Sequence, residues 1–345
     1  MIKNVYVLFL ICCSYISAQQ TNLISFKDDI TSIATDARAA GMGDIGVATS
    51  ADVFSQNWNP SKYLFVSKQF EIGMVQLFVP NEDLQFDEFQ QANITFYKKH
   101  SNERSAIGLS IKGYASSSFN RFGLFSNNLE FSVDGSYTLK LSNEFAMSVT
   151  GRFVSLNGKF RQINENDSFF SVDVSGFYFG KEIGYKKFNG RWRAGFNFAN
   201  FRNESSIEDK AAGSYFPTTI SLGTGFDFIF NHDVLLGVTS EYQLFLNSYN
   251  EGPNGQQLYN NLEGSIGSLG LELSLQEKIF ARTGYSLGID RASNTFFSLG
   301  AGVKSKYIDV DMAFIFGSDE NVSLIRQKLR ISLGLDIEVI LFGAN

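Results

Sequence analysis

The fold class is clearest in Leu329-Arg-Ile-Ser-Leu-Gly-Leu-Asp-Ile337, late in the chain. Apolar residues occupy every odd position of it, whereas Arg, Ser, Gly and Asp occupy the even positions. A period of two gives a β-strand one apolar face and one polar face. The same alternation recurs in Ile308–Phe316, Leu269–Leu275, Phe145–Phe153 and Ala106–Gly113. The chain is therefore expected to be all-β.

The alternating segments are about ten residues long, which is the length that a tilted strand needs to cross a bilayer. Short turns such as Leu141–Asn143 alternate with longer polar loops such as Asn247–Asn260. A soluble sandwich has no reason to segregate its loops by length, whereas an outer-membrane barrel has short periplasmic turns and long outer loops. We expect fourteen strands, at 68–79, 90–99, 105–116, 127–140, 144–156, 169–186, 191–201, 215–229, 233–247, 261–275, 278–288, 294–304, 306–316 and 325–337.

These strands predict a 14-stranded antiparallel transmembrane β-barrel over residues 67–338, with both termini in the periplasm because the strand number is even. Charged side chains on the polar faces would point into the lumen, since each would be costly in lipid. They are Lys112, Arg152, Asp173, Arg193, Glu272, Asp309, Asp311, Arg330 and Asp336.

The N-terminus resembles a secretion signal over residues 1–18. Lys3 precedes an apolar core, and Ile16-Ser-Ala18 supplies a small residue before cleavage. Both cysteines, Cys12 and Cys13, lie in this signal, so the mature chain is expected to have no disulfide, no thiolate zinc site and no cysteine nucleophile. The net charge of −6, without a basic stripe, argues against nucleic acid as a partner. Residues 339–345 are expected to be a C-terminal tail, either a short extension or a foreign addition.

A Gly/Ala-rich segment between the signal and the first strand predicts a hatch, over residues 19–66, that closes the barrel. Its Gly41-x-Gly43-x-x-Gly46 matches a dinucleotide fingerprint, but no strand precedes it and no βαβ pattern follows. Phe54 and Trp58 either line a pocket behind the hatch or pack the hatch against the wall. The structural motif of the hatch is Arg38, Gly41, Gly43, Asp44, Gly46, Trp58, Asn59 and Pro60.

Catalytic, cofactor and metal sites are not expected. His100 and His232 lie in predicted turns, far apart in sequence, and are interpreted as solvated. Glu82, Asp83 and the neighbouring carboxylates of the 80–89 loop lack the spacing and glycine of an EF-hand calcium loop. Apolar residues in two outer loops are candidates for partner binding. They are Leu84, Phe86, Phe89, Phe119, Phe122 and Phe125.

The segments Asp36–Asp52 and Asn57-Trp-Asn-Pro-Ser-Lys-Tyr63 resemble the start of the PorV family, also called LptO, an outer-membrane component of the type IX secretion system. More distantly, the chain looks like the FadL fatty-acid transporter superfamily, whose hatch carries a Gly/Ala-rich segment and an Asn-Pro-Ala turn. Here that turn reads Asn59-Pro60-Ser61.

The resemblance implies a non-enzymatic barrel without cofactors, embedded in outer-membrane lipid. It would bind the C-terminal signal domain of cargo leaving the large translocon barrel and carry it to the cell-surface sortase and attachment machinery. Two alternatives follow from the same resemblance. One is a FadL-like transporter of hydrophobic small molecules, and the other is a lipopolysaccharide O-deacylase, for which the sequence offers no triad.

Overall fold

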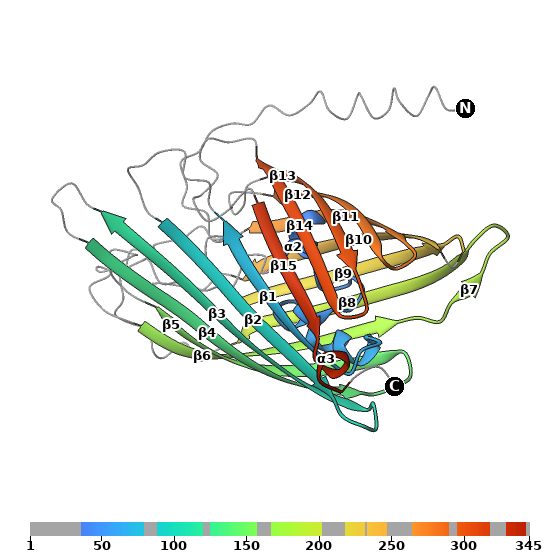
Figure 1. Ribbon diagram of the computed structural model, residues 1–345, viewed down its shortest axis with the longest axis horizontal. Helices are drawn as coiled ribbons and strands as arrows, with labels where there is room; N and C mark the ends of the chain where they lie inside the picture. The colour runs from blue at the N-terminus through green and yellow to red at the C-terminus, as the bar shows by residue number, and fades with distance from the viewer. Residues whose placement is uncertain are drawn as a thin grey trace.

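A computed structural model describes residues 36–78, 88–119, 125–156, 167–201, 218–231, 233–246, 264–289, 295–317 and 329–342. All strands belong to one antiparallel sheet (Figure 1). They are β1 (Phe70–Phe78), β2 (Glu88–Lys99), β3 (Ser105–Phe119), β4 (Phe125–Lys140), β5 (Phe145–Leu156), β6 (Asp167–Phe179), β7 (Ile183–Gly184), β8 (Asn189–Phe201), β9 (Thr218–Ile229), β10 (Val234–Leu246), β11 (Gly264–Leu275), β12 (Ile279–Ile289), β13 (Phe296–Lys304), β14 (Ile308–Gly317) and β15 (Leu329–Asp336).

The sheet closes on itself. Strand β1 pairs with β15, from Glu71 opposite Asp336 to Phe78 opposite Leu329, and β6 pairs with β8. Within the described residues the closed ring has fourteen strands, because the two-residue β7 pairs only with β8 and lies outside the ring. The predicted 14-stranded antiparallel barrel is confirmed.

One predicted strand, 169–186, is wrong as a continuous element. Strand β6 ends at Phe179, and the chain then forms a separate short β7. Strand β5 begins at Phe145, opposite Tyr178, so β5 does not lie beside the residues that follow Phe179, and β7 pairs only with β8. The last strand also ends one residue earlier than predicted. Its Asp336 Oδ1 accepts the N–H of Val339 at 3.1 Å and starts helix α3 (Ile337–Phe342) over the predicted tail.

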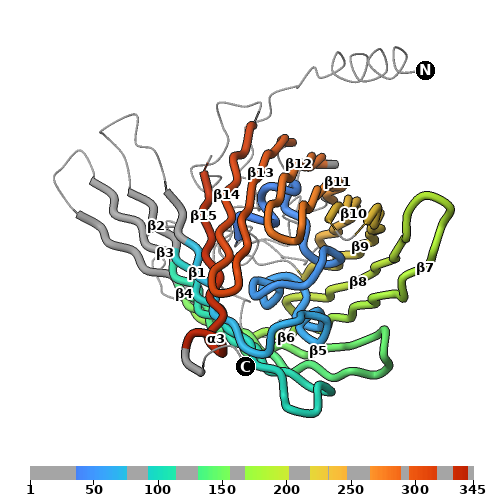
Figure 2. Tube along the Cα trace, turned by 45° about the vertical axis from the view of Figure 1, so that its right-hand side comes forward, coloured from blue at the N-terminus to red at the C-terminus, as the bar shows by residue number. Residues whose placement is uncertain are grey.

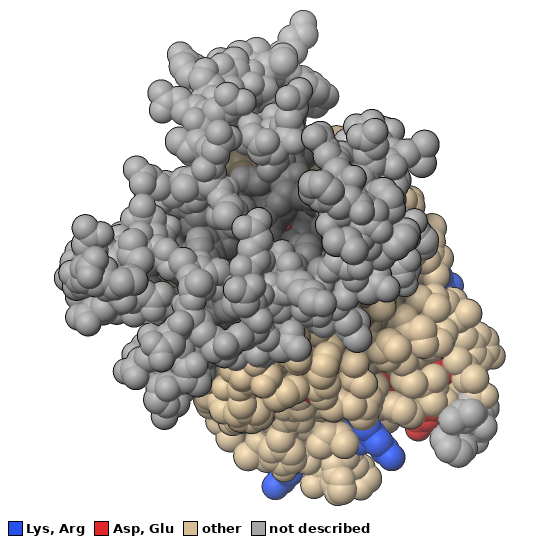
Figure 3. Space-filling model, turned by 90° about the vertical axis from the view of Figure 1, so that its left-hand side faces the viewer, with Lys and Arg blue, Asp and Glu red and all other residues tan. Residues whose placement is uncertain are grey.

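The two faces of the wall differ in polarity, as the alternation predicts. Ile107, Ile111 and Val149 on the outer face are each at least half exposed, and the described wall in Figure 3 is almost free of charge. All nine predicted lumen charges lie inward. Lys112 and Arg152, for example, are both buried beside Asp134, at 3.2 and 2.8 Å. Among the described residues, no helix is long and apolar enough to cross a membrane.

The hatch lies inside the ring of strands (Figure 2). Its described part contains α2 (Ala37–Gly41) and two 3-10 helices, η2 (Val53–Asn57) and η3 (Pro60–Phe65). The main apolar cluster joins hatch to wall, with Val53, Phe54 and Tyr63 packed near Val75 and Tyr97. Tyr63 and Tyr97 stack with their ring centroids 4.5 Å apart. Phe54 is 4% exposed and packs the hatch against the wall, the second of its two predicted roles.

Candidate functional site

The described part of the hatch begins with a capped helix. Asp36 Oδ1 accepts the N–H of Ala39 at 2.8 Å, which satisfies one free amide of the first turn of α2. Asp36 Oδ2 accepts the indole N–H of Trp58, also at 2.8 Å, and so ties the start of the hatch to its end. Burial, and after it the nearby Asp52 carboxylate, raise the pKa of Asp36 to about 6. Within the hatch, therefore, this carboxyl group titrates close to neutral pH.

Arg38 joins the hatch to the barrel wall. Its Nε and Nη2 donate to the two carboxylate oxygens of Glu272 on β11, at 2.8 and 2.7 Å, and its Nη1 donates to Asp52 at 2.8 Å. Glu272 also accepts from Arg282 Nε at 2.6 Å, and Arg282 Nη1 reaches Asp311 at 2.6 Å. A two-pronged guanidinium–carboxylate pair fixes orientation as well as distance. Burial alone would raise the pKa of Asp52, but the Arg38 charge lowers it.

A second connection uses the backbone of the hatch. The Glu241 carboxylate on β10 accepts the N–H groups of Gly46 and Val47, both at 2.9 Å. Arg193 on β8 donates to the carbonyl of Ala48. These wall charges therefore satisfy peptide groups that have no helix or sheet partner, which buried backbone requires.

Asn59 and Pro60 lock the C-terminal part of the hatch. The Asn59 amide donates to Val47 O at 3.0 Å and to Gly176 O of β6 at 2.9 Å. Pro60 occupies the first position of η3, where its missing N–H costs nothing, and its carbonyl accepts from Thr138 of β4 at 3.1 Å. The predicted Asn-Pro turn is thus a contact with the wall.

Lys62 stabilises the segment of the hatch around Gly46 and Thr49. Its Nζ donates to Gly46 O at 2.7 Å and to Thr49 Oγ1 at 3.0 Å. Burial lowers the pKa of Lys62 to about 8.

The glycines of the motif are close to other groups. Gly43 has φ of +82°, and a Cβ there would lie 3.0 Å from the backbone of Tyr285. At Gly46 a Cβ would overlap the Trp58 ring. At Gly41 a Cβ would lie 3.0 Å from the Cα of Gly300 on β13. The fingerprint spacing therefore reflects tight packing of the hatch against β12, β13 and Trp58.

Asp44 completes the predicted hatch motif. Its φ of 57° is a left-handed conformation that Asp tolerates better than most residues, and its Oδ1 lies 3.4 Å from Arg330 Nη1 on β15. All eight predicted hatch residues thus contact the wall or another part of the hatch. The sequence reasoning missed Glu241, because its partners are backbone amides and leave no charge pattern in the sequence.

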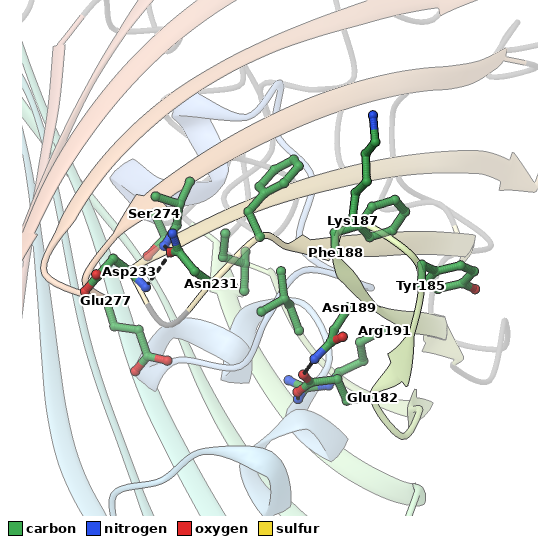
Figure 4. A pocket seen from close by; sticks show the side chains of 14 residues that line it. Glu182, Tyr185, Lys187, Phe188, Asn189, Arg191, Asn231, Asp233, Ser274 and Glu277 are labelled. Atoms are coloured by element: carbon green, nitrogen blue, oxygen red, sulfur yellow. Dashed lines mark hydrogen bonds and ion pairs between the residues drawn. The ribbon is translucent and has the colours of Figure 1, made fainter.

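A pocket of about 600 Å³ opens at the short-turn end of the barrel (Figure 4). Its floor includes Ile229 and Leu235, which share the inward face of their strands with charged lumen residues. Residues of the hairpin between β7 and β8 form one side, where Asn189 Nδ2 donates to Glu182 Oε1 at 2.6 Å. The turns after β9 and β11 form the other side. No group of three or more His, Cys, Asp or Glu suited to a metal ion occurs within the described ranges.

Comparison with protein families decides the relationship. The family model described as "Type IX secretion system protein PorV" matches residues 16–249. The chain belongs to the PorV family. This membership makes it a component of a type IX secretion system, and the predicted resemblance is confirmed. A search of curated proteins finds no match.

Solved structures share the fold of this PorV-family chain. The monoaromatic hydrocarbon channel CymD is 12% identical, with 88% of this chain and 97% of that chain covered and a TM-score of 0.55. A deltaS2S3 mutant of the channel TodX is 13% identical, with 87% and 97% covered and a TM-score of 0.53. The toluene transporter TbuX of Ralstonia pickettii is 12% identical, with 87% and 96% covered and a TM-score of 0.52. At these identities the likeness shows the fold alone, a closed β-barrel.

The predicted partner-binding residues are only partly described. Leu84, Phe86 and Phe122 lie outside the described residues, as do Glu82, Asp83 and Asp87 of the acidic loop. Phe89 lies near the start of β2, whereas Phe119 ends β3 directly opposite Phe125, the first residue of β4. These three positions share the long-loop end of neighbouring strands. Their role in binding stays a prediction.

Of the two histidines, the structure describes His100 alone, and it does not bring this residue into a site. His100 lies in the exposed turn after β2, where its backbone N–H donates to the carbonyl oxygen of Ser105 at 2.8 Å. His232 lies outside the described residues.

Proposed function

We propose that this PorV-family barrel binds the C-terminal signal domain of type IX cargo at its long-loop end. It receives the cargo from the large translocon barrel and delivers it to the cell-surface sortase and attachment complex. Its role is binding and carriage, without catalysis.

The observation that carries this proposal is the anchored hatch. Arg38, Glu241 and Asn59 each take part in buried hydrogen bonds between hatch and wall. A hatch held by buried ion pairs and capped backbone is costly to displace. A barrel whose lumen is closed in this way is better suited to presenting a rigid surface to a partner than to letting solutes pass.

Aromatic side chains at the ends of neighbouring strands fit the binding role. Phe89, Phe119 and Phe125 belong to β2, β3 and β4, which are consecutive in the sheet. Aromatic residues are enriched at the centres of protein interfaces, where they bury large areas.

The test replaces Leu84, Phe86, Phe89, Phe119, Phe122 and Phe125 with alanine and measures capture of a purified cargo C-terminal domain in a pull-down. We expect at least about a tenfold loss of affinity, because central interface aromatics cost about 2 kcal/mol each or more. The matched control makes six alanine substitutions on the outer wall, at Ile94, Ile107, Ile111, Val149, Leu269 and Leu271. Unchanged capture by the loop variant, with both variants folded, would refute the loop assignment.

The orientation of the barrel belongs to the same proposal. The hatch meets β1, and β15 meets α3, at the short-turn end, which we assign to the periplasm because outer-membrane barrels keep their short turns there. A cysteine introduced at Lys187 should resist a membrane-impermeant thiol reagent in intact cells and react after lysis. A cysteine at Asn250 should react in intact cells, and the opposite pattern would invert the barrel.

Transport of hydrophobic small molecules is the second candidate, since the three structural neighbours are named as hydrocarbon channels or a toluene transporter. It requires the hatch to leave an apolar path. Uptake of a fluorescent hydrophobic tracer into proteoliposomes would support it if an Arg38→Met variant were faster than the parent chain. Equal, background uptake by both proteins would oppose it.

Lipopolysaccharide deacylation is the third candidate. A lipid A profile that is unchanged in a deletion strain would remove it. A changed profile restored by a His100→Ala, His232→Ala double variant would show that neither histidine is its base.

A further inference from the structure

The hairpin of β7 and β8 differs from the other short turns. It projects beyond the neighbouring turns at the right of Figure 1, and the other described turns at this end are tight. Residues 181–187 are all exposed. Its base carries a cluster of rings on the outward face of the wall.

The ring cluster is on the side that faces away from the lumen. Arg193 and Asp227 form an inward ion pair at 2.7 Å, so Trp192 and Phe226, one position away, point outward. Trp192 and Phe226 lie 4.8 Å apart, and Tyr185 stacks on Phe188 at 5.0 Å. Phe188 in turn approaches Phe228 and Phe230, at 5.2 and 6.2 Å.

The cluster is large yet uncovered. Tyr185 is 45% exposed, Trp192 is 52% exposed and Phe230 is 49% exposed. It continues the apolar outer wall at the level where the strands end. Rings with one polar edge, such as Trp and Tyr, favour the boundary between hydrocarbon and headgroups.

Positive charge accompanies the rings. Lys186 and Lys187 are exposed and have no ion-pair partner within the described part of the chain. Lys181 meets Glu144 at 3.3 Å but is 81% exposed. The one acid of the hairpin, Glu182, is already bound to Asn189 and Arg191. The chain as a whole is acidic, at −6, so this local excess of free ammonium groups is unusual.

We propose that Tyr185, Phe188, Trp192, Phe226 and Phe230, together with Lys186 and Lys187, form a site for an anionic glycerophospholipid of the adjacent leaflet. This set of seven residues is called the hairpin patch. The rings pack against the glycerol backbone and upper acyl chains, and the two ammonium groups bind the phosphodiester. The lipid would be selected by its negative charge next to an apolar tail. A surface that carries both aromatic rings and lysines is complementary to these two features.

The test uses the parent chain in vesicles and its own tryptophans as probes. The chain has two tryptophans. Trp58 lies in the hatch, out of contact with lipid, so quenching by brominated lipid reports on Trp192. Brominated phosphatidylglycerol and brominated phosphatidylcholine are compared in otherwise identical vesicles, and a Trp192→Phe variant verifies that the quenched signal is the intended one.

We expect phosphatidylglycerol to associate about thirtyfold more strongly than phosphatidylcholine, as expected for two lysines at a lipid surface. Lys186→Gln with Lys187→Gln should bring the ratio to about one. The matched control, Lys278→Gln with Lys306→Gln, removes the same charge from other turns of the same end and should leave the ratio unchanged.

A ratio near one in the parent chain would overturn the proposal and leave the hairpin patch to a protein partner. An equal loss of selectivity in both double variants would also overturn it, because the effect would then be general surface charge. The proposal rests on membrane embedding and not on cargo binding, so it survives failure of the cargo pull-down.

Discussion

Asp36 is a buried carboxyl group whose two oxygens both accept hydrogen bonds, from Ala39 and from Trp58. Its pKa is raised from 3.8 to about 6, so the folded hatch binds this proton more tightly than an unfolded hatch does. The stabilisation from Asp36 is then complete below about pH 4 and is lost as the pH rises through about 6. The carboxyl group and the indole share one hydrogen bond, so the ring should report this titration.

The first prediction follows from this bond. In a Trp192→Phe background, the emission of Trp58 should change with a midpoint near pH 6, because ionisation of Asp36 alters the charge at the indole N–H. The Asp36→Asn variant should show no transition between pH 4 and 8. A midpoint near 3.8, the ordinary value, would contradict the raised pKa.

Gly43 is the second test at the residue scale. Its φ of +82° and the 3.0 Å approach to Tyr285 leave no room for a side chain. Gly43→Ala should destabilise the docked hatch by about 2 kcal/mol, through strain and the displaced contact. Hydrogen exchange of the amides of residues 39–47 measures this loss of stability. Gly135→Ala is the control, since a Cβ at Gly135 would meet nothing within 4 Å. Equal protection of these amides from exchange in the two variants would contradict the close packing of Gly43 against Tyr285.

Among the elements, the polar network that joins the hatch to the wall is distinct from a second network that lies within the wall. Arg38 connects α2 with β11, whereas Arg152 pairs with Asp134 and Asp173 within the wall, at 2.8 Å each. Removing one partner of a buried pair leaves an uncompensated charge, which typically costs 3–5 kcal/mol.

This separation makes a paired prediction. Arg38→Met should lower the free energy of hatch opening by about 3 kcal/mol, because the Glu272 carboxylate loses its bidentate partner. The change should be seen as faster hydrogen exchange in residues 37–47. Arg152→Met should lower the thermal stability of the barrel and leave exchange in the hatch unchanged. Faster hatch exchange in both variants would mean that the two networks are coupled.

Across the whole molecule, the closed ring and the hatch together decide whether solutes pass. A 14-stranded ring is wider than the small barrels that side chains fill unaided, so the lumen needs the hatch to close it. Deleting residues 36–66 should raise the single-channel conductance in planar bilayers about tenfold or more, with heat-modifiable migration on gels confirming a folded barrel. The parent chain should show little conductance. A deletion variant as closed as the parent would show that other residues block the lumen.

Several features could be predicted from the sequence alone because they are local. Leu329–Asp336 alternates strictly, and a strand of period two must put Arg330 and Asp336 on the polar side whatever its neighbours are. The turn residues between such strands set their number and their antiparallel order. Gly43 and Asn59 were assigned to the hatch by composition and by family resemblance.

The predictions failed or stopped where the answer depends on a neighbour. The strand predicted at 169–186 breaks after Phe179 because β5 begins at Phe145, opposite Tyr178, and no property of residues 180–186 shows where another strand begins. The bonds from Glu241 to Gly46 and Val47 join residues about 195 positions apart, and backbone donors carry no residue type that a sequence pattern could reveal.

The amino-acid pattern alone predicts a barrel of alternating strands preceded by a small-residue segment, because alternation and residue size act over a few neighbouring positions. Which wall charges hold that segment depends on the folded ring, because ring closure brings Glu272, Arg282 and Asp311 into one chain of ion pairs with Arg38. Their electrostatic energy depends on distance and burial, and both quantities exist only once the ring has closed around the hatch.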